Sequence, residues 1–341
     1  MELPLRKQQI LSAIVESYIK TGEPVGSKTL RNIWFSDVSP ATVRNDMAFL
    51  TYNGYLSQPH TSAGRVPSMQ GYRYYIDRLM QRKPVPERVQ AYIDRNLKDY
   101  ADTPENILKR SSKILSDVTD LISITSTPSG EDTSIQSVRF VQTGRYTAMA
   151  IIITSTGVVK SKLFRSEYLI NSDILKIFDN ALNSRFSGLK LMELTQPMIQ
   201  STAASLGELS LYMPSALMAV KEAAMSAGYV DININGQQKL LLTHDIDLDI
   251  AANILRFLND TQGVVTLLHD TENLGTKILI GEESNWTELM SSSLIISKYK
   301  IAGHIAGALA LLGPLRMDYA SLIGMLEYVS EIVGNLIDEI I

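Results

Sequence analysis

The sequence contains no cysteine among its 341 residues. This absence excludes disulfide bridges, thiolate metal sites and cysteine nucleophiles. It is also typical of a protein that works in a reducing compartment.

Long apolar segments are missing as well. The first 18 residues are interrupted by charge every few positions and contain no signal-peptide core. The longest apolar run near the C-terminus, residues 301–313, includes His304 and glycines. It is shorter than the roughly 20 residues that a membrane-spanning helix needs. We therefore expect a cytoplasmic protein.

Signatures of enzymes and of metal sites are sparse. The histidines are scattered, and no pair has the i, i+4 spacing of a helical zinc site; they are His60, His244, His269 and His304. Residues 244–249 match a calcium loop at three positions, but they lack its central glycine and distant glutamate. Acidic residues at a helix start explain that run more simply. No phosphate-binding Gly-Lys-Ser/Thr loop is present. We expect no catalytic residue, no metal and no cofactor.

Length and charge indicate several domains of different character. A chain of this length, 45% hydrophobic, is long enough for two or three cores. Residues 1–83 contain 11 Lys and Arg against 6 Asp and Glu, whereas the remaining residues contain 21 against 30. A basic module on an acidic body suits a nucleic-acid-binding protein, although chance variation in composition produces the same asymmetry.

Apolar spacing predicts three helices in the basic module. Ile10, Ile14 and Tyr18 share one helical face before Thr21-Gly22 ends the pattern. Ser27 is expected to cap a short second helix. The third helix should begin at Ser39-Pro40, where the serine hydroxyl can accept a backbone N–H and proline fits the first turn.

The third helix has a face suited to DNA. Its buried side should carry Val43, Met47 and Leu50. The other side then presents small residues near the helix start together with one arginine and one asparagine: Ser39, Ala41, Thr42, Arg44, Asn45 and Ala48. Small residues let a helix enter the major groove, arginine can pair with guanine, and asparagine can pair with adenine.

A short hairpin is predicted after the third helix. Residues 55–56 and 65–66 flank a polar run in which Gly64 can take the positive φ of a turn. Its tip offers hydrogen-bond donors for phosphate or for the minor groove, namely His60, Thr61, Ser62 and Arg65. A solvated loop is the alternative for this tip. Three helices followed by a hairpin make a winged helix-turn-helix.

The remaining chain mixes helix and strand. Residues 68–82 should form a fourth helix that packs on the first, and prolines at 84 and 86 mark a domain boundary. Beyond it we expect helix over residues 87–122, two strands that turn at residues 155–157, and helices between residues 172 and 228. Asn235-Gly236 is a strong hairpin signal. A helix near residues 250–258, further strands and a last helix over residues 319–340 complete an α+β multidomain chain.

The chain resembles the bacterial heat-inducible transcription repressor family, HrcA, over nearly its whole length. The N-terminal runs that carry the resemblance are IVESYIKTGEPVGSKTL, VSPATVRNDMAFLTYNGYLSQPHTSAGRVPS and GYRYYIDRLM. Two later motifs are TKILIGEES and LLGPLRMDY. The chain departs from the family at Leu315, where threonine is more usual, and in residues 48–51, which lack the acidic side chains common there.

The resemblance implies a fold and a function. The fold is a winged helix over residues 1–84 and a GAF-like domain over residues 85–171 and 263–341, interrupted by a dimerisation domain. We expect this insert over residues 172–262, with its Leu- and Met-rich helices forming the dimer interface. The implied function is a homodimeric, nucleoid-associated repressor that binds the inverted-repeat operator CIRCE upstream of chaperone operons. In the family the chaperonin GroEL keeps the repressor active, and heat diverts the chaperonin to unfolded clients.

One alternative function stays open. A winged-helix regulator could sense a small ligand in its GAF-like body, or use the helix module to regulate an enzyme. The lack of clustered histidines or catalytic carboxylates disfavours the enzyme. Arg316-Met317-Asp318-Tyr319 could form a ligand or interface patch, but an arginine beside an aspartate at a helix start is more often structural.

Overall fold

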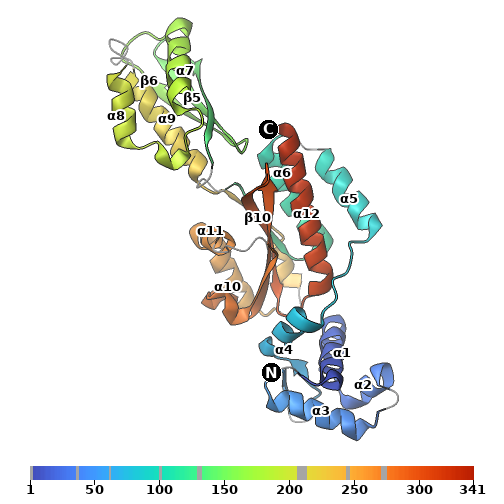
Figure 1. Ribbon diagram of the computed structural model, residues 1–341. Coiled ribbons are helices and arrows are strands. Elements are labelled where there is room, and N and C mark those ends of the chain that lie inside the picture. Colours follow the sequence, from blue (N-terminus) through green and yellow to red (C-terminus); the bar gives the residue numbers. More distant parts are fainter. Residues whose placement is uncertain are drawn as a thin grey trace.

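The computed structural model describes residues 3–35, 38–60, 63–99, 102–128, 133–205, 213–242, 246–269 and 275–341. These residues form three parts arranged along the molecule (Figure 1). An N-terminal module lies at one end, a mixed helix and sheet body lies in the middle, and a unit inserted into the sequence of the body lies at the other end. The chain is therefore an α+β multidomain protein.

The N-terminal module contains three helices, a two-stranded hairpin and a fourth helix that widens into a π-helical turn. Its elements are α1 (Leu5–Thr21), α2 (Ser27–Trp34), α3 (Pro40–Tyr52), β1 (Leu56–Ser57), β2 (Val66–Pro67), α4 (Met69–Tyr74) and η1 (Tyr75–Leu79). The three predicted helices and the fourth are confirmed, with Ile10 and Ile14 fully buried. The predicted cap at Ser27 is wrong, because Gly26 holds the N-cap position and Ser27 is the first helical residue.

The body is built around a five-stranded antiparallel sheet of order β7-β3-β10-β9-β8. The strands are β3 (Ile122–Ser126), β7 (Ile232–Asn235), β8 (Lys277–Ile280), β9 (Ser292–Ile301) and β10 (His304–Pro314). Every residue of β3 is buried, and β10 is buried from Ala306 to Pro314. Central strands covered on both faces take such continuous apolar sequences.

Helices cover both faces of this sheet (Figure 1). The elements are α5 (Glu87–Lys98), α6 (Pro104–Thr119), η4 (Gln237–Leu242), α10 (Leu248–Asn259), α11 (Thr261–His269), η5 (Gly281–Ser284), η6 (Thr287–Leu289) and α12 (Tyr319–Ile340). α6 and α12 share one core with the sheet and the module, whereas α10 and α11 form a second core on the opposite face. α12 is the one helix of the described residues that is long and apolar enough to cross a membrane, yet most of it is buried as the central helix of the body.

The inserted unit has its own sheet and its own core. It contains β4 (Ile135–Gln142), β5 (Thr147–Thr154), β6 (Val159–Arg165), α7 (Ser172–Phe186), η2 (Leu191–Glu193), α8 (Gln196–Ala204) and α9 (Met213–Gly228). The strands form an antiparallel sheet in the order β4-β5-β6. Small side chains at Ala216, Ala223 and Ala227 let α9 pack closely on that sheet.

The inserted unit, as defined by its core, begins and ends at other residues than the expected insert of residues 172–262. The core of the inserted unit runs from Ile135 to Ala227, so this unit includes the two strands that the sequence suggested for the body, together with β4, which was not predicted. α10, which the expected insert of residues 172–262 included, packs in the core of the body. The predicted strands, their turn at Gly157 and the last helix are confirmed.

The predicted hairpin at Asn235-Gly236 is wrong. β7 pairs with β3, more than 100 residues away in the sequence, and Gly236 leads into the 3-10 helix η4. Gly236 has φ +89°, and a Cβ there would lie 2.2 Å from the Ser116 hydroxyl oxygen. Its positive φ turns the chain off the sheet edge rather than into a partner strand.

Candidate nucleic-acid interface

α3 presents the residues that the sequence predicted at its surface. Val43, Met47 and Leu50 are buried against the module core, as expected. The Ser39 hydroxyl accepts a hydrogen bond from the Thr42 backbone N–H at 3.1 Å, which confirms the predicted helix start. The opposite side of the helix is exposed at Ser39, Ala41, Arg44, Asn45 and Ala48, and Thr42 is half-buried.

Asp46 ties this helix to α1. It is only 5% exposed, and its carboxylate lies 2.6 Å from the Arg6 Nε and 3.2 Å from the Lys7 Nζ. Burial acts to raise the pKa of Asp46, but hydrogen bonds and charge from Arg6 and Lys7 outweigh it and lower that pKa below its ordinary value. Lys7 also lies over the Phe49 ring, 4.6 Å from its centroid.

The sequence reading missed Asp46 as a core position. Its spacing of three from Val43 and four from Leu50 places it on the buried face. An acidic residue at such a position needs a cationic partner, and α1 supplies two in its first turn. The ion pairs of Asp46 with Arg6 and Lys7 therefore fix the orientation of α3, and with it the direction of its exposed face, relative to α1.

Asp46→Asn should destabilise the module by about 1–3 kcal/mol at neutral pH, because two charge-assisted contacts are lost. A pKa lowered by folding contributes stability above the unfolded value, about 4, and this contribution disappears on acidification. Amide hydrogen exchange of α1 and α3 should therefore differ between variant and wild type at pH 7 and converge as the pH falls below about 4. Asp99→Asn, at the exposed residue that follows α5, is the matched control. A variant that exchanges like wild type at pH 7 would contradict this role.

The hairpin after α3 differs in detail from its prediction. His60 is exposed beyond β1, while Thr61 and Ser62 lie outside the described residues. Arg65 is half-buried away from the tip, and its Nε donates to the Thr51 hydroxyl of α3 at 3.0 Å. The Arg65 backbone also forms two hydrogen bonds of 2.9 Å with Val25. Arg65 thus joins the hairpin to α3 and to the segment just before α2.

The role predicted for Gly64 is wrong in its physical reason. Gly64 is not among the glycines with positive φ. Instead, a Cβ at this position would lie 2.5 Å from the Val25 carbonyl carbon and oxygen. The glycine is required because two backbone segments approach closely there.

Basic side chains on α2 extend the exposed surface, and the sequence reading did not single them out. Lys28 and Arg31 are exposed, and their i, i+3 spacing places them on one face of the helix. α2 and α3 contact each other and lie together at the end of the molecule farthest from the inserted unit (Figure 1). This spacing was the signal that could have found them.

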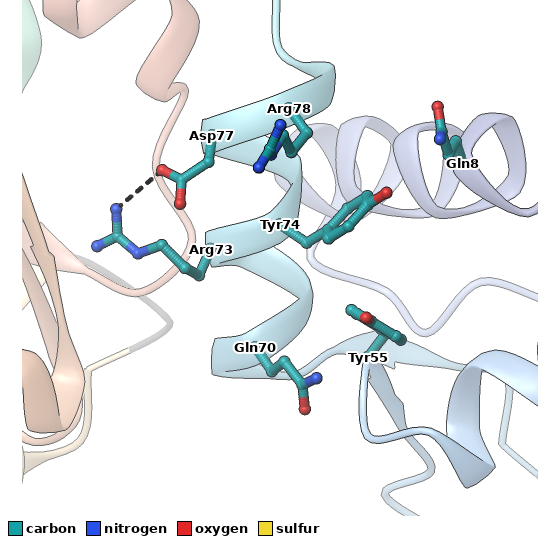
Figure 2. Close-up of a pocket in the computed structure, with 7 residues that line it drawn as sticks. All are labelled: Gln8, Tyr55, Gln70, Arg73, Tyr74, Asp77 and Arg78. Carbon is teal, nitrogen blue, oxygen red and sulfur yellow. Dashed lines mark hydrogen bonds and ion pairs between the residues drawn. The ribbon is translucent and has the colours of Figure 1, made fainter. Parts of the chain in front are cut away.

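A polar hollow lies on the other side of the module, around α4 and η1 (Figure 2). Its lining residues are Gln8, Tyr55, Gln70, Arg73, Tyr74, Asp77 and Arg78. Arg73 and Asp77 point toward the body, whereas Tyr74 stacks edge-on against Tyr55 with 5.4 Å between ring centroids. Among the described residues no three His, Asp or Glu side chains are grouped so that they could hold a metal ion. His244 lies outside those residues.

Comparisons with known proteins point to one family. Residues 105–323 match the family model described as HrcA protein C terminal domain. The chain is 30% identical to the heat-inducible transcription repressor HrcA of Desulforamulus reducens and 31% identical to that of Moorella thermoacetica. Each alignment covers 100% of this chain and 99% of the relative. A crystal structure of a hypothetical protein, 22% identical, has a TM-score of 0.65 over the full length of both chains and therefore shares the fold.

Proposed function

The chain belongs to the HrcA family of heat-inducible transcription repressors, and from this membership we propose how it recognises DNA and how it is controlled. It is a transcriptional repressor of the heat-shock response rather than an enzyme. In our proposal it acts in the cytoplasm, on the nucleoid, as a homodimer that binds the inverted-repeat operator CIRCE upstream of chaperone operons. The exposed face of α3 is the observation that carries this proposal.

The N-terminal module fits a winged helix-turn-helix. α3 would be the recognition helix, since its exposed start is small and carries both Arg44 and Asn45. Ser39, Ala41 and Thr42 would lie at the entrance to the major groove. The hairpin would be the wing, with His60, Thr61, Ser62 and Arg65 near phosphates. Lys28 and Arg31 on α2 would add phosphate contacts.

The described residues leave one sheet face of the inserted unit exposed, and its exposed apolar side chains fit a dimer interface. α7 and α9 pack against one face, where Ala148, Ala150 and Ile152 are buried. On the other face the strand register places Val141, Met149 and Leu163 in one row across the sheet. Val141 is 46% exposed and Leu163 is 59% exposed. A strand that is apolar on both faces is typical of one covered on both sides.

A second copy of the chain would cover this face. The expectation that the helices of the insert form the interface is thus replaced by a proposal for the sheet. We assign dimerisation to residues 133–229, with a GAF-like body formed by residues 85–132 and 230–341. The limits of the dimerisation unit follow its separate core, whereas residue 85 keeps the boundary expected from the prolines.

Control by the chaperonin GroEL follows from the family resemblance. GroEL would keep the repressor in its active form, and heat would divert the chaperonin to unfolded clients, so that repression lapses. Copurification separates this regulation from the alternative of a small-molecule sensor: bound chaperonin supports the former, and a bound small molecule supports the latter.

Binding of the purified full chain to DNA tests the function. The probe is an inverted repeat with half-sites spaced by about one to two helical turns, the range used by dimeric helix-turn-helix proteins. We expect one dimer per duplex and binding on the order of 10³-fold or more tighter than to a scrambled duplex. Equal affinity for repeat and scrambled DNA would overturn the proposal.

Arg65→Ala should weaken binding to operator and to random DNA alike and lower the salt dependence by about one phosphate contact. Thr51→Val is the matched control, because it removes the acceptor of the Arg65 Nε while the positive charge remains. Its salt dependence should equal that of wild type. A change in the preferred operator bases in Arg65→Ala would instead assign base or groove-shape recognition to the wing.

A further inference from the structure

Two sequence motifs of the body remain without a role in DNA binding or in the dimer. TKILIGEES covers residues 276–284, and LLGPLRMDY covers residues 311–319. They are separated by β9 and most of β10, yet both contact the N-terminal module. We call the surface that they form the socket and define it by Ile278, Gly281, Glu283, Arg316, Asp318 and Tyr319.

Arg73 of α4 makes a bidentate ion pair and a backbone contact with the socket. Its guanidinium forms a two-pronged ion pair with Glu283, with the Nε at 2.8 Å from one carboxylate oxygen and an Nη bonded to the other. An Nη also donates to the Ile278 carbonyl at 2.8 Å. Asp77 holds the guanidinium from within the module at 3.3 Å (Figure 2). A planar, bidentate contact of this kind fixes orientation as well as distance.

Glu283 is itself held in place by the turn that carries it. Its carboxylate accepts the Ile280 backbone N–H at 2.9 Å. Gly281, between them, has φ +54°, and a Cβ there would lie 2.5 Å from the Met69 sulfur and 2.7 Å from the Met290 carbonyl oxygen. The first residue of α4 therefore rests directly against the backbone of the socket.

Contacts from the second motif reach α1, α4 and the linker. Arg316 donates to the Ile19 carbonyl at 2.7 Å, near the C-terminus of α1, where a cation is favourable. The Tyr319 and Tyr72 rings meet edge to face at 6.0 Å. Asp318 pairs with Lys83 at 3.0 Å in the linker between module and body. The second motif thus contacts the module and its linker at three separate points, in addition to the Arg73–Glu283 ion pair of the first motif.

This socket lies between the DNA-reading face and the proposed dimer interface. The module and the inserted unit lie at opposite ends of the body (Figure 1). In a dimer joined through the inserted units, the relative placement of the two α3 helices is transmitted through each body and each socket. A dimeric helix-turn-helix protein binds two half-sites only when their spacing matches the placement of its recognition helices.

We propose that the Arg73–Glu283 contact, supported by Arg316, determines which half-site spacing the repressor accepts. The inference rests on the proposed function. Arg73 and Glu283 act here as positioning residues: they touch no base, and they set the orientation of the helix that does. Loosening the contact leaves each module able to read its half-site while the two modules lose their fixed separation.

Arg73→Ala and Glu283→Gln test this in the full chain. Affinity is measured for inverted repeats whose central spacer changes one base pair at a time, and for a duplex with a single half-site. Wild type should prefer its best spacer over its neighbours by on the order of tenfold, the scale of a typical coupling between sites. Both variants should flatten this preference and bind the single half-site as wild type does.

Two further variants separate positioning from general damage. Arg82→Gln removes the exposed linker pair with Glu327, at 2.8 Å, and should leave the spacing preference unchanged. Arg73→Glu combined with Glu283→Arg restores an ion pair of opposite direction and should recover part of the preference. If Arg73→Ala is not folded by circular dichroism, Glu283→Gln alone decides.

The outcomes distinguish the two levels of the proposal. A wild-type protein that binds the inverted repeat no better than a scrambled duplex contradicts the proposed function. A wild-type protein with a clear spacer optimum, matched by the same optimum in Arg73→Ala and Glu283→Gln, overturns only the role of the socket. Loss of affinity for the single half-site in both variants also overturns the role of the socket. The Arg73–Glu283 contact would then stabilise the N-terminal module itself rather than its position.

Discussion

If the chain dimerises as proposed, Leu163→Lys should make the full-length protein monomeric and weaken operator binding by about 10²–10⁴-fold. Leu163 lies on β6, on the open apolar face of the inserted sheet, directly opposite Met149 of β5. Sedimentation velocity and operator titration, carried out on the same preparation, measure the two effects.

The size of this effect comes from linkage rather than from lost DNA contacts. In the proposed dimer each module reads one half-site, and joining two modules makes the second binding event intramolecular. A lysine on the sheet face places an unpaired ammonium group in an interface centre that would be dry, which costs several kcal/mol. Affinity for a single half-site should therefore remain at the wild-type value.

Leu248→Lys is the matched control for this prediction. Leu248 is 77% exposed at the start of α10, on the body rather than on the inserted unit. The substitution Leu248→Lys makes the same chemical change outside the proposed interface. It should leave both the sedimenting mass and the operator affinity unaltered. A Leu163→Lys protein that still sediments as a dimer would exclude this sheet face as the interface.

Local sequence signals predicted the helices and the hairpin of the N-terminal module well. The start of α3 depends on one serine hydroxyl and one proline, and its buried face depends on 3.6-residue spacing, both of which lie within a single helix. The hairpin position was correct within one residue. The function of Gly64 was missed because its neighbour, Val25, is distant in the sequence.

Non-local pairing explains what the sequence did not reveal. The segment around Gly236 has the residues typical of a hairpin turn. However, β7 pairs with β3, which precedes the whole inserted unit in the sequence. The expected limits of the inserted unit differ from those of its core for the same reason. The alternation of residues along strands within residues 135–165 does not show which sheet these strands join. Asp46 and the socket likewise depend on partners from other elements.

Arg44→Ala should weaken specific operator binding by about 1–3 kcal/mol per half-site, the usual value of a bidentate arginine–guanine pair. Arg44 is exposed one residue beyond the buried Val43, near the start of α3. Within the described residues no ion pair or hydrogen bond engages its side chain, so its removal should leave the module fold intact.

The expected signature is a loss of discrimination and not only of affinity. Wild type should distinguish all four bases at one position in each half-site, and Arg44→Ala should accept them nearly equally there. Competition titrations at one fixed salt concentration, with operators altered at single positions, measure this directly.

Two arginine variants separate base reading from charge. Arg44→Lys keeps the positive charge but lacks the planar fork, so it should retain the salt dependence of wild type and lose most of the base discrimination. Arg31→Ala, on the exposed face of α2, should weaken all DNA sequences alike and leave discrimination intact. If Arg44→Ala discriminates among operator variants as wild type does, another element reads the bases, and α3 is not the recognition helix.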